Sequence, residues 1–214
     1  MQFGGIAGGF YQAGTWIIRL FTLNLLWLLF SLLGLLVFGL FPATIAMFTV
    51  VRKWINGHKD LPLIRTFWDS YRTNFLRANI LGFIQIVIAY MIYIDYMFLD
   101  TLSGWSAVLL NVILISALIL FSVVLLFIFP VYVHYQLKIF QYIRLSIIIG
   151  ISYPIQTIFM LFCVVLCYVI IHVIPGILLF SGSTLSFFMM RIANDVFVKI
   201  EVKKNQENKR TSLA

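Results

Sequence analysis

The chain has 214 residues, of which 63% are hydrophobic and only 10% are charged, and its mean hydropathy is +1.06. In soluble domains roughly a quarter of the residues are charged, so this composition excludes a soluble domain. It predicts an all-α, polytopic transmembrane bundle whose main partner is the lipid bilayer. The formal net charge is +8. Because the basic residues fall between apolar runs, they indicate cytoplasmic helix ends rather than a nucleic-acid surface.

The first apolar run covers residues 20–41 and is long enough to cross a hydrocarbon core of about 30 Å. We expect a tight turn at 39–42 and then a shorter helix from about 43 to 55, because proline is tolerated at the first position of a helix. Arg52 and Lys53 end this helix and can snorkel to the interface. With this helix as a crossing, the chain spans the membrane six times. If it lies along the interface, there are five spans and the N-terminus is outside.

The next segment, 63–79, has apolar side chains at three- and four-residue spacing and polar side chains opposite them. This pattern predicts an amphipathic helix on the cytoplasmic membrane surface. Its candidate partner-docking residues are Arg65, Trp68, Asp69, Tyr71, Arg72 and Phe75. Asp69 can pair with Arg65 or Arg72. Simple anchoring at the interface explains the pattern equally well, so docking is a hypothesis.

Four further spans are predicted. They cover residues 80–99, about 107–130, about 145–174 with interruptions at Gly150 and Pro154, and about 177–198. The turn between the last two has two candidates, Pro175-Gly176 and the "SGST" stretch at 181–184. The whole chain, 1–214, is expected to form a single integral-membrane domain with a charged cytoplasmic tail at 200–214.

The distribution of charge predicts the orientation. With six crossings and both termini in the cytoplasm, all 15 basic residues lie at or beyond cytoplasmic helix ends. The outer turns, at 39–42, 98–106 and 174–184, contain none. This asymmetry is the one that the positive-inside rule describes.

Five polar residues within the spans are candidate intramembrane sites: Asn24, Gln85, Asn111, Arg191 and Asp195. Charged groups in lipid indicate function by default, but Arg191 and Asp195 are four residues apart near an interface, which favours a structural pair. A buried amide can link two helices for about 1 kcal/mol, and this is our main interpretation of Asn24 and Asn111. Alternatively, Asn24, Gln85 and Asn111 line the polar cavity of a transporter or channel for a small neutral solute.

Motifs of catalysis are missing from the sequence. It has no HExxH, paired histidines, Walker loop, GxGxxG or GxSxG, so we expect no catalytic, cofactor-binding or metal-binding residues and no enzyme. Cys163 and Cys167 lie one turn apart in an apolar run and are interpreted as packing residues, since this spacing suits a disulfide poorly. His134 is interpreted as an interfacial histidine.

Four short elements in the first 85 residues stand in a recognisable order. They are Asn24-Leu25-Leu26-Trp27, Pro42-Ala43-Thr44, Val51-Arg52-Lys53, and Phe67 with Asn74-Phe75. In this order they resemble the YesL family of bacterial multi-pass membrane proteins over residues 15 to 85, with a departure at Phe41, where the family pattern has glycine.

The resemblance implies a bacterial cell membrane location and an accessory role in sugar uptake. Members of the family tend to be encoded near carbohydrate ABC importers, so the implied partners are importer permease subunits. The resemblance supplies no catalytic residues, and it leaves the oligomeric state open.

Overall fold

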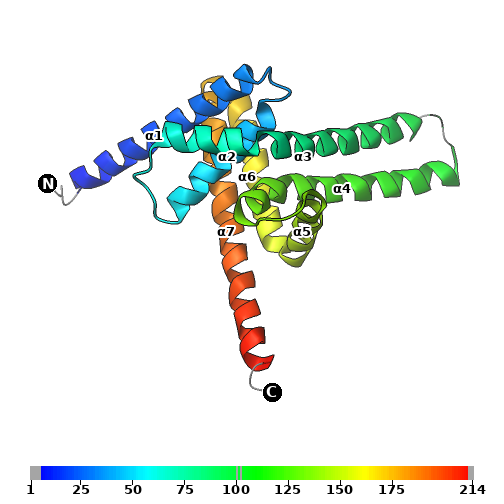
Figure 1. The fold of residues 1–214 in the computed structure, drawn as a ribbon. Coiled ribbons are helices and arrows are strands. Elements are labelled where there is room, and N and C mark those ends of the chain that lie inside the picture. The colour runs from blue at the N-terminus through cyan, green and yellow to red at the C-terminus, as the bar shows by residue number, and fades with distance from the viewer. Residues whose placement is uncertain (1–5, 100, 102, 212–214) are drawn as a thin grey trace. The chain divides into compact units, whose positions relative to one another are not determined.

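The computed structural model describes residues 6–99, 101 and 103–211, and every regular element among them is a helix (Figure 1), which confirms the all-α prediction. The helices are α1 (Ile6–Leu33), α2 (Leu40–Ile55), α3 (Leu63–Leu99), α4 (Trp105–His134), α5 (Ile139–Ser152), α6 (Pro154–Val173), the short 3₁₀ helix η1 (Pro175–Ile177) and α7 (Leu178–Thr211).

Among the described residues, five helical segments are long and apolar enough to cross a membrane. They are Tyr11–Leu33, Leu63–Leu99, Trp105–His134, Pro154–Val173 and Pro175–Gln206. The expected sixth crossing is α2, whose 16 residues extend about 24 Å at 1.5 Å per residue, less than a hydrocarbon core. Judged by length, the structure therefore has five membrane-spanning helices, the smaller of the two predicted numbers.

The turn between α1 and α2 lies at residues 34–39 and not at 39–42 as predicted. Two glycines explain the shift, because the backbones of Gly34 and Gly39 touch: a Cβ on Gly34 would overlap the Cα of Gly39. Leu35 and Leu36 adopt φ angles of 56° and 60°, a left-handed conformation that is uncommon for residues with a side chain. The chain thus reverses before the proline, which is buried in the first turn of α2.

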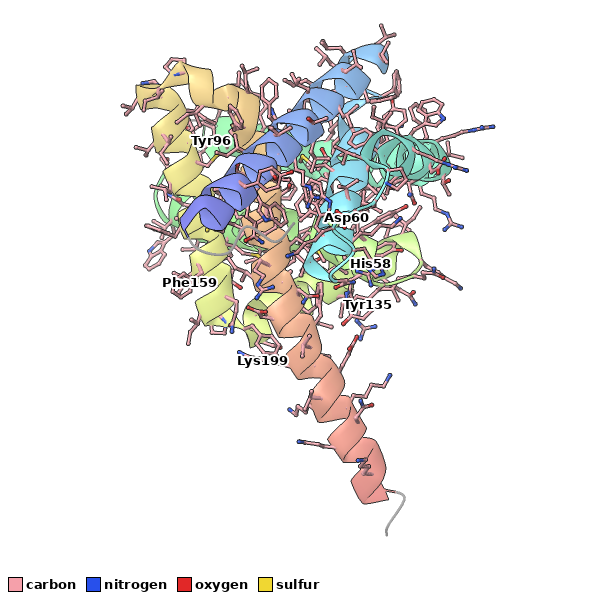
Figure 2. The ribbon with its side chains drawn as sticks, turned by 90° about the vertical axis from the view of Figure 1, so that its left-hand side faces the viewer. His58, Asp60, Tyr96, Tyr135, Phe159 and Lys199 are labelled. Carbon is pink, nitrogen blue, oxygen red and sulfur yellow. The ribbon has the colours of Figure 1, made fainter. Side chains whose placement is uncertain are left out.

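Helix α2 returns beside α1 in a hairpin. Trp27 Nε1 donates a hydrogen bond of 3.0 Å to Thr44 Oγ1, and farther along the pair the rings of Trp16 and Trp54 meet edge to face at 5.7 Å. The loop after α2, where Figure 2 labels Asp60, then forms an ion pair of 3.0 Å with Arg19. The hairpin therefore brings the chain back to the end at which the first span begins, although α2 is short.

Helix α3 is continuous from Leu63 to Leu99, so the amphipathic segment and the following span are one helix rather than two. Residues 74–81, where they join, contain neither proline nor glycine, and nothing there interrupts the helix. Figure 1 shows α3 and α4 side by side, joined at their far ends. Near the other end of this pair, the Tyr132 hydroxyl donates a hydrogen bond of 3.0 Å to Asn74 Oδ1. Asn74 lies about 38 Å along α3 from the end of that helix at Leu99, at 1.5 Å per residue. This end of the hairpin therefore projects beyond a hydrocarbon core of about 30 Å.

The predicted span at 145–174 is instead two helices, α5 and α6, separated at Tyr153. The residue before a proline is driven out of the helical region, and Tyr153 has φ −125° and ψ 65° in front of Pro154. Helix α5 folds back on α4, where Gly150 touches Val123 and lies beside Phe127.

The last turn lies at η1, the first of its two candidates, and residues 181–184 are inside α7. The segment expected as a charged tail continues α7 to Thr211. In Figure 2 its side chains beyond Lys199 point away on several sides of the helix.

The chain forms two compact units. Unit 1 is Met1–Thr73 with Phe162–Arg191, and unit 2 is Asn74–Leu161 with Ile192–Ala214. Each has its own core of side chains that are at most 1% exposed. In unit 1 these include Leu23, Ile45, Val50, Phe67 and Met190; in unit 2 they include Phe127, Ile128, Ile149, Met160 and Phe197.

Candidate docking surface and intramembrane polar residues

One side of the first part of α3 packs inside unit 1. The ring of Phe30 on α1 lies 5.3 Å from Phe67 and 5.1 Å from Tyr71, and the Tyr71 hydroxyl donates to the Phe30 carbonyl at 3.3 Å. Ser70 donates to Thr49 Oγ1 on α2 at 3.0 Å. Tyr71 is only 7% exposed. It therefore belongs to the core and cannot serve as a docking residue.

The other side of this segment is exposed, and we call Ile64, Arg65, Trp68, Asp69 and Arg72 the α3 surface. Arg65 and Asp69 form the predicted pair at 4.0 Å, with side chains 83% and 67% exposed. Such an exposed pair contributes little to stability, so both charges remain available to a partner. Trp68 is 43% exposed.

The ring of Trp68 is held in place from within unit 1. It stacks on Tyr71 at 6.1 Å with an interplanar angle of 15°, and it lies 5.5 Å from Phe30. A half-exposed tryptophan with a fixed ring is the kind of side chain that dominates binding interfaces. Phe75, the sixth docking candidate, is 37% exposed and belongs to unit 2.

Asn24 is completely buried in unit 1 and links α1 to α7. Its Nδ2 donates to the Leu178 carbonyl at 3.2 Å, and its Oδ1 accepts from the Ser183 amide at 3.1 Å. Gly182 makes this approach possible, because a Cβ there would lie 2.8 Å from Asn24 Oδ1. Small residues permit such close approach in lipid. These contacts have the form expected of an amide that fixes two helices.

The other two amides have different surroundings within unit 2. Gln85 is 4% exposed, and neither polar atom of its side chain has a hydrogen-bond partner among the described residues. It continues the buried face of α3 formed by Ala78, Leu81 and Gly82. Asn111, by contrast, is on an exposed face of α4. It therefore faces away from the packed interior of unit 2.

Arg191 and Asp195 are both exposed on α7. None of the ion pairs found in the described part of the chain involves either residue. Their predicted pairing therefore has no support in the structure.

A cluster of aromatic and ionisable side chains was not predicted from the sequence. His134 Nε2 lies 3.3 Å from Glu201 Oε1, and its ring lies 4.3 Å from Phe197. Tyr135 packs on both rings, at 4.6 and 5.4 Å. Burial raises the pKa of Tyr135, and the neighbouring Glu201 carboxylate adds to this effect. His134 and Glu201 are 67 residues apart, a separation at which no spacing rule links them.

Residues that could hold a metal do not converge in the described part of the chain, where no group of three or more His, Cys, Asp or Glu side chains is found. Cys163 and Cys167 are free thiols. They line an apolar cleft of about 230 Å³ between α6 and α7 in unit 1, together with residues such as Ile170, Leu185 and Phe188.

Five long apolar helices and two packed cores define a polytopic helical membrane protein. The family described as "Protein of unknown function, DUF624" matches residues 20–96. Uncharacterized protein YesL of Bacillus subtilis (strain 168) is 37% identical over 94% of this chain and 96% of its own. The chain therefore belongs to the YesL-like family.

Two other proteins of Bacillus subtilis (strain 168) are similar to this chain over most of its length. Uncharacterized protein YteU is 36% identical over 100% of this chain and 96% of its own, and Uncharacterized protein YesV is 32% identical over 89% and 92%. The likeness thus extends well beyond residues 15 to 85, which contain the four short elements that resemble the family. No solved structure matches this chain.

Proposed function

We propose that this protein is a non-enzymatic accessory subunit of a carbohydrate ABC importer in the bacterial cell membrane. The importer comes from the family resemblance. The observation that supports docking is the α3 surface, in which a positioned Trp68 lies among exposed charges. Interfaces are enriched in tryptophan and arginine, and here both are presented by a packed helix.

The proposed orientation counts the short α2 as a sixth crossing and places the α3 surface in the cytoplasm, with both chain termini. Three features of the structure agree with it. The α1–α2 hairpin returns to the end where Arg19 lies, Asn74 and Tyr132 end the α3–α4 hairpin beside Arg77, and α7 continues past Lys199. Basic residues thus gather at the same end of each pair of helices, as the positive-inside rule requires.

The test of docking is co-purification of the full-length protein from its own host in mild detergent, with permease subunits identified by mass spectrometry. Two variants each alter one residue of the α3 surface: Trp68→Ala removes the ring, and Arg72→Glu reverses a charge. Two matched controls make the same changes elsewhere: Trp105→Ala, at a tryptophan that is 86% exposed, and Arg144→Glu, at an exposed arginine on α5.

We expect the controls to retain the permease subunits and each α3 variant to lose at least about tenfold of them, because a central interface tryptophan contributes about 2 kcal/mol or more. Repeated recovery of the chain alone, or equal loss in variants and controls, contradicts the proposal. Labelling of Lys59 or Lys203 by an impermeant reagent outside intact cells contradicts the orientation separately.

A second function, passage of a small neutral solute, is favoured by one observation, the buried and unpartnered amide of Gln85. A solute that meets this amide would satisfy it. Against this function, the amide of Asn24 is already bonded within unit 1 and Asn111 lies on an exposed face. Liposomes that contain only this protein distinguish the two functions. Uptake of a small neutral solute that is lost in Gln85→Leu supports transport, and absence of uptake supports the accessory role.

A further inference from the structure

A groove of about 350 Å³ lies in unit 2 between α5 and the last part of α7. Its lining residues are Leu145, Ile148, Ile149, Ser152 and Tyr153 from the α5 side, and Ile200, Lys203 and Lys204 from α7. Neither the α3 surface nor the amide of Gln85 belongs to this groove.

The two walls of the groove have a regular origin. On α5 the lining positions 145, 148, 149 and 152 repeat at three- and four-residue spacing, as do 200, 203 and 204 on α7, so each wall is one face of one helix. The floor is aliphatic on both sides. Two lysines and two hydroxyl-bearing residues stand on the same walls, which makes the groove amphipathic.

The level of the groove follows from helix lengths. Helix α6 begins at Pro154, directly after Tyr153, and its 20 residues extend about 30 Å, the thickness of a hydrocarbon core. Tyr153 therefore lies at one boundary of that core, where tyrosine is enriched. The groove opens at the depth of lipid headgroups and not in the middle of the bilayer.

The charge on the groove is positive. Lys203 and Lys204 are exposed, and Lys199, labelled in Figure 2, lies one turn before them. Glu201 does not line the groove, because its carboxylate is turned toward His134 at 3.3 Å. The lysines thus face the groove, and its lining residues in the described part of the chain include no carboxylate.

We propose that this groove binds one anionic phospholipid. Its phosphate lies between Lys203 and Lys204, with the hydroxyls of Ser152 and Tyr153 as further donors, and the first part of an acyl chain lies along Ile148 and its aliphatic neighbours. Basic pockets between membrane helices on the cytoplasmic side recognise anionic headgroups in this way.

The positive charges and the aliphatic floor of the groove together select this occupant. A zwitterionic lipid brings its own cation, which the two lysines repel. A soluble phosphate compound satisfies the lysines and leaves the aliphatic floor in water, and each apolar Å² so exposed forgoes about 25 cal/mol. Only a ligand with both an anion and a hydrocarbon chain matches both walls. This inference goes beyond the proposed accessory role and does not depend on it.

Native mass spectrometry of the full-length protein in detergent tests the proposal, with phosphatidylglycerol and phosphatidylcholine added in turn and the Kd of each measured. The rim variant, Lys203→Gln with Lys204→Gln, removes both positive charges from the edge of the groove. Its matched control, Lys53→Gln with Lys59→Gln, removes the same charge from exposed positions in unit 1. The variant Ile148→Asn alters the floor, and Ile151→Asn, on the same helix but outside the groove, is its control.

We expect phosphatidylglycerol to bind more tightly than phosphatidylcholine. The rim variant weakens phosphatidylglycerol about thirtyfold, since each lysine near an anionic lipid contributes about fivefold, while its control changes the Kd less than about twofold. Ile148→Asn weakens binding more than Ile151→Asn does.

Three results overturn the proposal. Equal affinity for the two lipids removes the anion selectivity, and equal effects in variants and controls remove the groove. Displacement of the lipid by millimolar glycerophosphate assigns the lysines to a soluble phosphate compound instead. Thermal unfolding of each variant separates loss of binding from loss of folding.

Discussion

Replacing Asn24 by leucine tests the link between α1 and α7 most directly. The two side chains are similar in size, so the change removes the amide without opening a large cavity. Both hydrogen bonds of Asn24 are lost, from Nδ2 to the Leu178 carbonyl and from the Ser183 amide to Oδ1. Asn24→Asp is the companion variant, because it places an oxygen against the Leu178 carbonyl, 3.2 Å away.

The expected loss follows from the two bonds. Hydrogen bonds between membrane helices contribute about 0.6 kcal/mol on average and at most about 1.7. Asn24→Leu should therefore lower the free energy of unfolding by about 1–3 kcal/mol, which corresponds to a decrease of roughly 3–10 °C in Tm for a chain of this size. Asn24→Asp should cost more, since Asn24 is completely buried and the new side chain is either charged or protonated at a cost.

The assay is thermal unfolding of the purified protein in one detergent, followed by circular dichroism. Asn111→Leu is the matched control, because Asn111 is exposed on α4 and we expect its replacement to change Tm by less than about 2 °C. Equal Tm values for wild type and Asn24→Leu would show that the two bonds do not hold α1 to α7. Equal losses in Asn24→Leu and Asn24→Asp would refute the geometry assigned to Nδ2.

Three further predictions concern the turn, the core and the α4–α5 junction. Gly34→Ala should reduce the folded yield severely, because its Cβ meets the Gly39 backbone, whereas Gly14→Ala, with open space around it, should be neutral or stabilising in thermal unfolding. Phe67→Ala should destabilise by about 3–5 kcal/mol in the same assay, while truncation of Ile64, 64% exposed, should have little effect. Burial raises the pKa of Tyr135 above its usual 10, so its neutral form stabilises the fold below pH 10 and this contribution is lost as pH rises further. Tyr135→Phe should therefore reduce the loss of stability above pH 10, measured as the free energy of unfolding at successive pH values.

Much of the fold could be predicted because lipid imposes simple rules on sequence. The all-helical class, the long apolar helices and the break before Pro154 follow from hydropathy and from the missing N–H of proline. The continuity of α3 was also present in the sequence, since residues 74–81 lack a helix breaker. The change of polar pattern near residue 80 predicts two helices, but a change of surroundings does not interrupt backbone hydrogen bonds.

Other features depend on contacts between distant residues. The reversal at 34–39 requires two glycine backbones to touch, and Gly34 by itself is one small residue in an apolar run. The burial of Tyr71 requires Phe30, which lies 41 residues away. For the same reason the face of an amphipathic helix that meets lipid or a partner cannot be distinguished by periodicity from the face that meets its own core.

The continuity of α3 also bears on how a partner is bound. Asn74 already lies about 38 Å from the α3–α4 turn, measured along the helix at 1.5 Å per residue, and it is fixed there by Tyr132. The α3 surface precedes Asn74 on the same unbroken helix, and its inner face is packed on Phe30 and Thr49. Its side chains are therefore positioned before a partner arrives, so binding does not require ordering of a loop. Preorganisation of this kind raises affinity without additional contacts, which supports the proposal that a surface of only five residues docks a partner.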